Sequence, residues 1–126
     1  MNNKFYICPH CGNIVTLIHD VGVPVFCCGK KMEEIVPNSV EASGEKHIPV
    51  ATVENGVVNV NVGAVDHPMQ AEHYIQWVWL KTEKGIQCVK LNPDEAPKAT
   101  FCVAEGDKPL EVYAYCNLHG LWKAEI

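Results

Sequence analysis

Four cysteines within the first 28 residues constrain the fold of this chain more than any other feature. Cys8 and Cys11 form a C-x2-C pair, and Cys27 and Cys28 are adjacent. The C-x2-C spacing lets two thiolates of one tight turn bind the same ion, whereas neighbouring side chains on an extended strand point to opposite faces. The adjacent pair can bind one ion only where the backbone turns sharply, which Gly29 would permit. The sequence therefore predicts a distorted tetrahedral site of four sulfurs that holds zinc or iron.

The segment that carries these cysteines is expected to be a separate module over residues 1–37. About 36 residues cannot bury enough apolar surface to fold alone, so a metal ion is expected to stabilise the module. The remainder, residues 38–126, has the alternating apolar pattern of strands, predicted over 48–53, 57–62, 74–81, 86–91, 99–103, 110–115 and 121–126. Seven short strands predict a mainly β chain whose second domain is an immunoglobulin-like β-sandwich. One helical turn is expected, at residues 66–72.

Composition narrows the functions that such a chain could have. Its 126 residues contain 15 acidic residues against 10 lysines, no arginine, and a net charge of −5. Without arginine and with scattered lysines, binding to nucleic acid or to an anionic membrane is not expected. The chain has neither an apolar stretch of about 20 residues nor the apolar core of a secretory signal, so we expect a cytoplasmic protein. A reducing compartment argues against disulfides between its seven cysteines.

A second group of metal ligands is predicted in the sandwich. Cys116 ends a strand and His119 follows at C-x2-H spacing, while His47, His67 and His73 lie near the ends of other predicted strands. Four neutral imidazoles and one thiolate make five ligands, one more than structural zinc takes. Five ligands leave one octahedral position open, which a redox iron site requires. Ferrous iron with one thiolate carries a net charge of +1, so a small anion is the expected substrate.

The remaining cysteines and two of the histidines are expected to have no chemical role. Cys88 and Cys102 lie among apolar residues of predicted strands and are expected to pack as buried thiols. His10 and His19 are expected to be ordinary structural residues.

These motifs resemble those of the desulfoferrodoxin family, the two-iron form of superoxide reductase. The first module resembles desulforedoxin through its Cys8-x2-Cys11 pair and its adjacent Cys27 and Cys28. The sandwich carries the runs GEKHIP at 44–49, HPM at 67–69, EHYI at 72–75 and CNLHG at 116–120. The resemblance covers essentially the whole chain, and none of the metal ligands is missing.

The resemblance implies a complete assignment of two non-haem iron sites. The first iron would be bound by Cys8, Cys11, Cys27 and Cys28. The second, catalytic iron would be bound by His47, His67, His73 and His119 in a plane, with Cys116 on the axis. Lys46 would lie near the open sixth position and attract superoxide, and Glu45 would bind there in the oxidised resting state.

The resemblance also implies an activity and partners. The iron would reduce superoxide to hydrogen peroxide with one electron, and an external donor such as rubredoxin would restore the ferrous state. The protein would be a homodimer. The main alternative is a cupredoxin-like electron-transfer protein with a structural zinc module, but blue copper takes two histidines, one cysteine and usually an axial methionine. No methionine follows His119, and four histidines are present. The other alternative is a zinc module joined to a non-catalytic interaction sandwich, which would make His47, His67 and His73 incidental.

Overall fold

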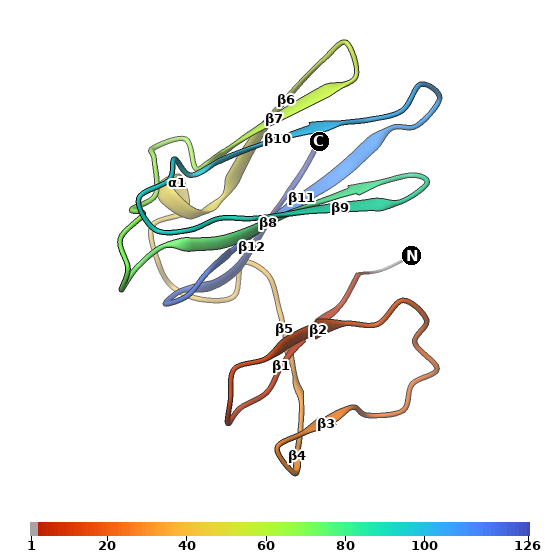
Figure 1. Cartoon of the computed structure of the whole chain (residues 1–126), viewed down its shortest axis with the longest axis vertical. Helices are drawn as coiled ribbons and strands as arrows, with labels where there is room; N and C mark the ends of the chain where they lie inside the picture. The colour runs from red at the N-terminus through yellow and green to blue at the C-terminus, as the bar shows by residue number, and fades with distance from the viewer. Residues whose placement is uncertain (1–2) are drawn as a thin grey trace. The chain divides into compact units, whose positions relative to one another are not determined.

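A computed structural model describes residues 3–126 of the chain. These residues form twelve β-strands and one helix of four residues, so the chain is mainly β, as predicted (Figure 1). The fold divides into two compact units, Met1–Val36 and Pro37–Ile126. In the described part of the chain, no helix is long and apolar enough to cross a membrane.

The N-terminal unit consists of short strands joined by turns. Its strands are β1 (Phe5–Ile7), β2 (Ile14–Thr16), β3 (Phe26–Cys27), β4 (Lys30–Lys31) and β5 (Glu33–Ile35). β1 lies between β2 and β5 in an antiparallel sheet, and β3 pairs with β4 in a separate hairpin. Among residues 3–36, the buried apolar side chains are those of Phe5, Cys8 and Met32. Such a small core agrees with the expectation that the unit depends on a bound metal.

The C-terminal unit is a sandwich of two antiparallel sheets. Its elements are α1 (Gly44–His47), β6 (Pro49–Glu54), β7 (Val57–Val62), β8 (Ile75–Thr82), β9 (Ile86–Lys90), β10 (Lys98–Cys102), β11 (Pro109–Cys116) and β12 (Gly120–Glu125). One sheet has the order β10-β7-β6 and the other the order β12-β11-β8-β9. All seven predicted strands are observed, with ends within one residue of those predicted. In the seven-strand immunoglobulin constant domain the fourth strand joins the first, second and fifth, whereas here the fourth strand, β9, pairs with β8.

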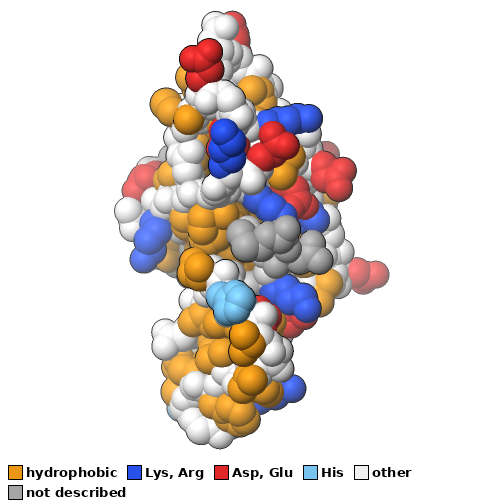
Figure 2. Space-filling model, turned by 90° about the vertical axis from the view of Figure 1, so that its right-hand side faces the viewer, with side chains coloured by type: hydrophobic (Ala, Val, Ile, Leu, Met, Phe, Trp, Pro, Cys, Tyr) orange, Lys and Arg blue, Asp and Glu red, His pale blue; other side chains and the backbone are white. Residues whose placement is uncertain are grey.

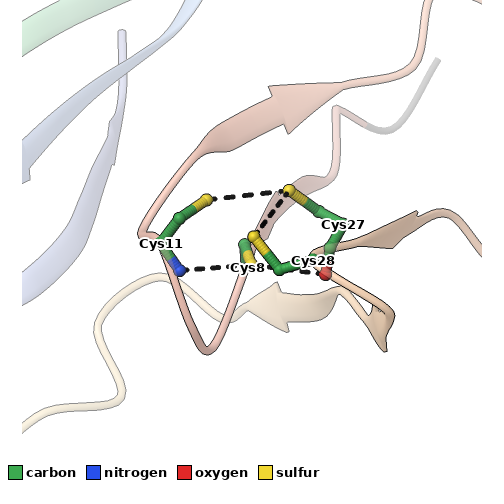
Figure 3. Close-up of side chains that lie close together, drawn as sticks. All are labelled: Cys8, Cys11, Cys27 and Cys28. Carbon is green, nitrogen blue, oxygen red and sulfur yellow. Dashed lines mark hydrogen bonds between the residues drawn. The ribbon is translucent and has the colours of Figure 1, made fainter.

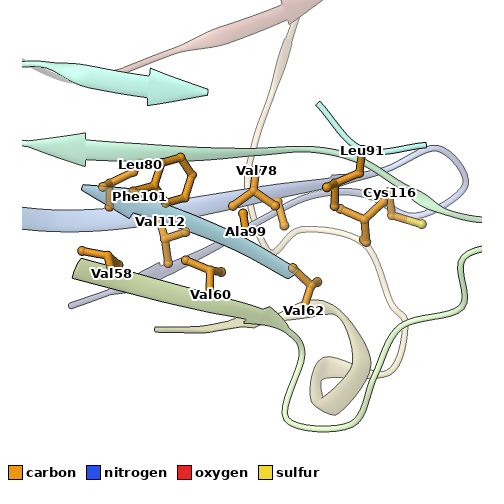
Figure 4. Packing of buried hydrophobic residues seen from close by; sticks show 12 residues of the cluster. Val58, Val60, Val62, Val78, Leu80, Leu91, Ala99, Phe101, Val112 and Cys116 are labelled. Carbon is orange, nitrogen blue, oxygen red and sulfur yellow. The ribbon is translucent and has the colours of Figure 1, made fainter. Parts of the chain in front are cut away.

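The core of the sandwich follows from alternation along its strands. Val58, Val60 and Val62 of β7 are at most 2% exposed, whereas Asn59 and Asn61 between them face outward. The buried cluster brings together side chains of both sheets and continues to the axial-ligand candidate at the end of β11 (Figure 4). Each fully buried Val or Leu contributes about 2 kcal/mol of hydrophobic stabilisation. The metal-ligand candidate Cys116 is therefore placed by the core itself.

Two local expectations from the sequence are wrong. Residues 66–72 form turns and an isolated bridge between Gln70 and His73, and the one helix of the described chain is instead α1. Cys88 and Cys102 are exposed rather than buried. Both cysteines belong to strands that bury only one face, and both lie on the outward face. In β10, for example, Ala99 and Phe101 occupy the buried positions, so Cys102 points outward.

A close backbone contact holds α1 in place. A Cβ atom on Gly63, just after β7, would lie 2.7 Å from the carbonyl oxygen of Glu45 and 2.8 Å from that of Ile48. The backbone N–H of Val65 donates a hydrogen bond of 2.8 Å to the same Glu45 oxygen. The turn after β7 therefore packs directly on the helix that carries Glu45, Lys46 and His47.

We predict that Gly63→Ala destabilises the C-terminal unit by about 1–3 kcal/mol, because the added methyl group must push α1 away. Urea unfolding of the variant and of the parent protein measures the difference. Gly85→Ala is the matched control, since a Cβ atom there meets nothing within 4 Å. Equal unfolding midpoints for the two variants would show that the contact at Gly63 does not constrain the helix.

Candidate metal centres

The first candidate centre is a cluster of four sulfurs in the N-terminal unit. Cys8 and Cys11 lie in the loop after β1 and face Cys27 and Cys28 (Figure 3). The four Sγ atoms lie within 4.8 Å of one another, with 3.6 Å between Cys11 and Cys27 and 4.0 Å between Cys27 and Cys28. A tetrahedral site with metal–sulfur bonds of about 2.3 Å has sulfur–sulfur edges of about 3.8 Å. No cysteine of residues 3–126 is in a disulfide.

Backbone geometry explains how adjacent cysteines reach the same point. Cys28 has φ 55° and Gly29 has φ 70°, so two successive residues take the left-handed conformation and reverse the chain. The sequence pointed to Gly29 alone, whereas the structure places Cys28 itself in this conformation. In the opposite loop, the backbone N–H groups of His10 and Cys11 each donate a 3.4 Å hydrogen bond to the Cys8 sulfur.

The charge balance of this cluster calls for a cation. The two N–H donors, chiefly that of Cys11, lower the pKa of Cys8 to about 6. The neighbouring Cys11 sulfur raises the pKa of Cys28 to about 12 and also raises that of Cys27. One thiolate is thus favoured, and further ionisation is opposed by like charge. A bound cation removes this opposition, because metal binding displaces thiol protons.

The second candidate centre gathers side chains from distant parts of the C-terminal unit. His47 ends α1, His67 and His73 lie in the loop between β7 and β8, and Cys116 ends β11. The ligand atoms of these four residues lie within 4.8 Å of one another. His119, in the turn before β12, lies beside them, with Nδ1 3.2 Å from His47 Nε2 and 3.9 Å from Cys116 Sγ.

The four imidazoles form a square. Going round it, the ring centroids are 4.6 Å apart for His47 and His67, 4.6 Å for His67 and His73, 5.1 Å for His73 and His119, and 5.0 Å for His119 and His47. The diagonal from His47 to His73 is 6.4 Å. Neighbouring rings are nearly perpendicular, with interplanar angles of 76° to 85°. This arrangement is compatible with four ligands that surround one ion in a plane.

The cysteine sulfur lies off the plane of that square. Cys116 Sγ is within 4.8 Å of ligand nitrogens on His47 and His73, which occupy opposite corners. The sulfur is also within 4.8 Å of a ligand nitrogen of His67 and 3.9 Å from Nδ1 of His119. A point outside the square but in its plane could not be this near all four corners, so the sulfur lies near the axis. Burial raises the pKa of the Cys116 thiol, and the backbone N–H groups of Leu118 and His119 partly offset this effect.

Hydrogen bonding fixes the imidazoles with free lone pairs turned inward. Nδ1 of His47 lies 2.7 Å from the Ser43 carbonyl oxygen, and Nδ1 of His67 lies 2.6 Å from that of Pro68. Each Nδ1 therefore carries the proton, which leaves both Nε2 atoms unprotonated and facing each other at 3.2 Å. Two facing lone pairs repel unless a cation lies between them. About 3.0 Å is the spacing of neighbouring nitrogens around an ion at about 2.1 Å.

The remaining properties of the pocket agree with a bound cation. Nε2 of His73 is buried and has no hydrogen-bond partner. Burial lowers the pKa of His67 to about 4, and it also lowers those of His47 and His73. These imidazoles are consequently neutral at neutral pH, which is the form that binds metal. The residues of this pocket therefore fit a bound metal ion.

Trp122 also supports the site, although the sequence carries no clear signal of this role. The Nε1–H of Trp122 donates a 3.1 Å hydrogen bond to the His119 carbonyl oxygen, and its ring lies 4.9 Å from that of His47. Trp122 is 4% exposed, so it closes one side of the site against water. Alternation along the last strand would place this residue inward, but it would not show that the ring meets a ligand.

The four remaining residues singled out from the sequence lie outside both clusters. Glu45 and Lys46 are exposed on α1, immediately before His47. Neither belongs to a group of metal-ligand atoms among residues 3–126. His10 and His19 are exposed in the N-terminal unit and also lie outside both groups.

Comparisons of the sequence and of the structure with known proteins agree on the family of this chain. The family model for desulfoferrodoxin matches residues 39–125. The chain is 43% identical to the desulfoferrodoxin of Syntrophotalea carbinolica, over 97% of this chain and 95% of that protein. It is similar in structure to the superoxide reductase from Treponema pallidum, with a TM-score of 0.84, 40% identity, and coverage of 98% of this chain and 99% of the other.

A shorter protein matches only part of the chain. The superoxide reductase (1Fe-SOR) from Giardia intestinalis covers 65% of this chain and 97% of its own, with 30% identity and a TM-score of 0.56. The similarity to the two longer proteins, in contrast, extends over nearly the whole chain, including the segments that carry both clusters. From the match to the family model, the sequence identity of about 40% over nearly the whole chain, and the two clusters together, we conclude that this chain belongs to the desulfoferrodoxin family.

Proposed function

We propose that the His/Cys cluster of the sandwich, loaded with iron, reduces superoxide to hydrogen peroxide. The chain is a superoxide reductase. The observation that carries this conclusion is the square of four imidazoles with a cysteine sulfur on its axis. That donor set differs from the two histidines and one cysteine of blue copper, so a cupredoxin-like carrier is not supported.

The proposed assignment of ligands follows the geometry of the two clusters. The first iron is held by the sulfurs of Cys8, Cys11, Cys27 and Cys28. The second iron is held by His47, His67, His73, His119 and Cys116. We assign residues 1–37 to a desulforedoxin-like module and residues 38–126 to the catalytic sandwich. His119 is the ligand that presents Nδ1, because that atom lies 3.2 Å from His47 Nε2.

The protein's part in the reaction is to hold the ion and its anionic substrate. When bound, ferrous iron supplies one electron, and with two protons superoxide becomes hydrogen peroxide. With Cys116 and the four imidazoles as ligands, the ion would have one face of the square left for a small anion. An external donor returns the electron; rubredoxin is the donor that the family resemblance suggests, and the cytoplasm is the compartment that we propose.

Lys46 is proposed to attract superoxide, and Glu45 to occupy the open face in the oxidised protein. The positive charge of Lys46 contributes to lowering the pKa of both His47 and His73, so its field reaches two corners of the square. The chain as a whole carries a charge of −5 and repels an anion. At a Debye length of ~8 Å most of that charge is screened, so the nearest lysine has the larger influence.

We predict that Lys46→Ala slows the reaction with superoxide by several-fold, on the order of 10-fold at low ionic strength, without loss of iron. Pulse radiolysis of the reduced protein measures the second-order rate constant at several salt concentrations. The difference from the parent protein is expected to shrink as salt increases. Lys98→Ala removes an exposed lysine from the outer face of the sandwich and is the control. Equal rate constants for the two variants would exclude steering by Lys46.

The four-cysteine centre is proposed to stabilise its own module rather than to take part in the reaction with superoxide. Its four ligands all lie in residues 8–28, within the unit Met1–Val36. The shorter Giardia intestinalis structure, named a superoxide reductase, matches only 65% of this chain.

We predict that Cys11→Ser removes the first iron and leaves most of the superoxide reduction in place, whereas Cys116→Ser abolishes it. Iron analysis should fall from two ions to one per chain in the first variant, and pulse radiolysis of the reduced protein should show consumption of superoxide without its dismutation. Loss of reduction in Cys11→Ser with the sandwich still folded would make the four-cysteine centre obligatory. A parent protein that binds two irons and does not consume superoxide would overturn the proposed function.

The homodimer suggested by the family resemblance is supported by apolar surface on the N-terminal unit. Hydrophobic side chains gather on the surface of that unit (Figure 2). Ile18 is 81% exposed and Phe26 is 64% exposed, with Val21, Val23 and Val36 also exposed. A unit with so small a core gains from covering such surface.

We predict that the iron-loaded protein sediments as a dimer and that Phe26→Ser weakens the dimer by about 10-fold or more. Sedimentation velocity over a range of concentrations provides the dissociation constants. Ile86→Ser, at a 38% exposed apolar position in the other unit, is the control. A monomer at all concentrations would contradict the proposal.

A further inference from the structure

Asn117 connects the loops that carry two of the proposed ligands. It follows Cys116, and its side-chain Oδ1 accepts a 2.9 Å hydrogen bond from the backbone N–H of Tyr74. Its Nδ2 donates a 3.0 Å hydrogen bond to the carbonyl oxygen of Glu72. Its own backbone N–H donates to the carbonyl oxygen of Tyr74 at 3.2 Å. Glu72 and Tyr74 are the two neighbours of His73, so three hydrogen bonds surround that ligand.

The side-chain amide continues a sheet that the backbone can no longer continue. β11 and β8 pair as far as Cys116 and Ile75, with a register shift between Tyr115 and Cys116. Such irregularities redirect side chains at the ends of strands. Beyond this point the amide group of Asn117 offers one acceptor and one donor, as a peptide group does. It therefore extends the ladder along residues 72–74.

The ring of His73 lacks the backbone hydrogen bond that fixes the rings of His47 and His67. His47 and His67 each donate a proton from Nδ1 to a backbone carbonyl oxygen, which fixes the ring. In residues 3–126 the ring of His73 has no hydrogen bond of its own, and its Nε2 is buried without a partner. Its backbone exchanges hydrogen bonds with Gln70, and the segments on both sides of it are held by Asn117.

We propose that Asn117 is a positioning residue, which holds His73 in register with Cys116 and so sets where the His73 nitrogen lies relative to the Cys116 sulfur. This inference rests on the proposed function of the site, but Asn117 itself touches neither the metal nor the substrate. Only asparagine meets the requirement: aspartate lacks the donor, alanine lacks both groups, and glutamine is one methylene longer.

Two variants separate the contributions of the donor and the acceptor. Asn117→Asp keeps the bond from the Tyr74 N–H and places a carboxylate oxygen against the Glu72 carbonyl, whereas Asn117→Ala removes both side-chain bonds. Asn59→Ala is the matched control, because it removes an asparagine on the outer face of the other sheet, where Oδ1 accepts from the Thr100 hydroxyl. Residues around metal ligands typically change metal affinity by about 10–100-fold when they are replaced.

The experiment measures ferrous iron binding by competition with a chelator, together with the thiolate-to-iron absorption band of the oxidised protein. Both Asn117 variants are expected to bind iron at the His/Cys site at least about 10-fold more weakly and to shift the absorption band. The loss of affinity is expected to differ in magnitude between Asn117→Ala and Asn117→Asp. Iron in the four-cysteine centre and binding by Asn59→Ala are expected to be unchanged.

Unfolding of the metal-free variants provides the structural control. If both Asn117 variants fold and retain parental iron affinity and an unshifted band, the proposal is overturned. If Asn117→Ala does not fold, Asn117→Asp alone decides between these outcomes, because it is nearly the same size as asparagine. Iron affinity is measured without superoxide, so a protein that binds iron as expected and does not reduce superoxide refutes the proposed function and leaves the role of Asn117 standing.

Discussion

The C-terminal unit is built around nitrogen lone pairs that have no proton between them. His47 and His67 give their Nδ1 protons to backbone carbonyl oxygens, and their Nε2 atoms face each other at 3.2 Å. Because burial also keeps these rings neutral, neither can relieve the repulsion by taking up a proton at neutral pH. The folded sandwich thus holds two unprotonated nitrogens close together, and only a bound cation would remove their repulsion. The packed core and the close contact at Gly63 hold the rings in place against this repulsion.

The two units position their metal ligands in different ways. The N-terminal unit has little core, and its sulfurs lie in the loop after β1 and at the turn between β3 and β4, two segments that a bound metal ion would join. The sandwich has a large core and carries its ligand candidates at the ends of its elements, and we propose that its metal site leaves one face free for an anion. A closed site of four sulfurs suits structure or electron storage, and an open site of positive charge suits reaction with a small anion.

The sequence predicted most of the chemistry and the strands, because ligand spacing and alternation are local patterns. All seven strands of the sandwich and both ligand clusters are found in the structure. The outward positions of Cys88 and Cys102 were not predictable from apolar neighbours alone, since a strand one residue out of phase turns every side chain to the other face. The helix at Gly44–His47 packs closely against Gly63, and the bonds of Asn117 to Glu72 and Tyr74 join residues more than forty positions apart. Such contacts between distant residues are not visible in local sequence patterns.

The separation of ligands along the chain has a consequence for the order of assembly. Cys8 and Cys28 enclose a short loop, whereas the ring contact between His47 and His119 joins residues 72 positions apart. Closing the longer loop costs more conformational entropy and requires both sheets to be in place first. We therefore expect the four-cysteine site to form from a short local segment, and the His/Cys site only once both sheets have paired. On this expectation, metal in the His/Cys centre would report on completed folding, and metal in the four-cysteine centre would not.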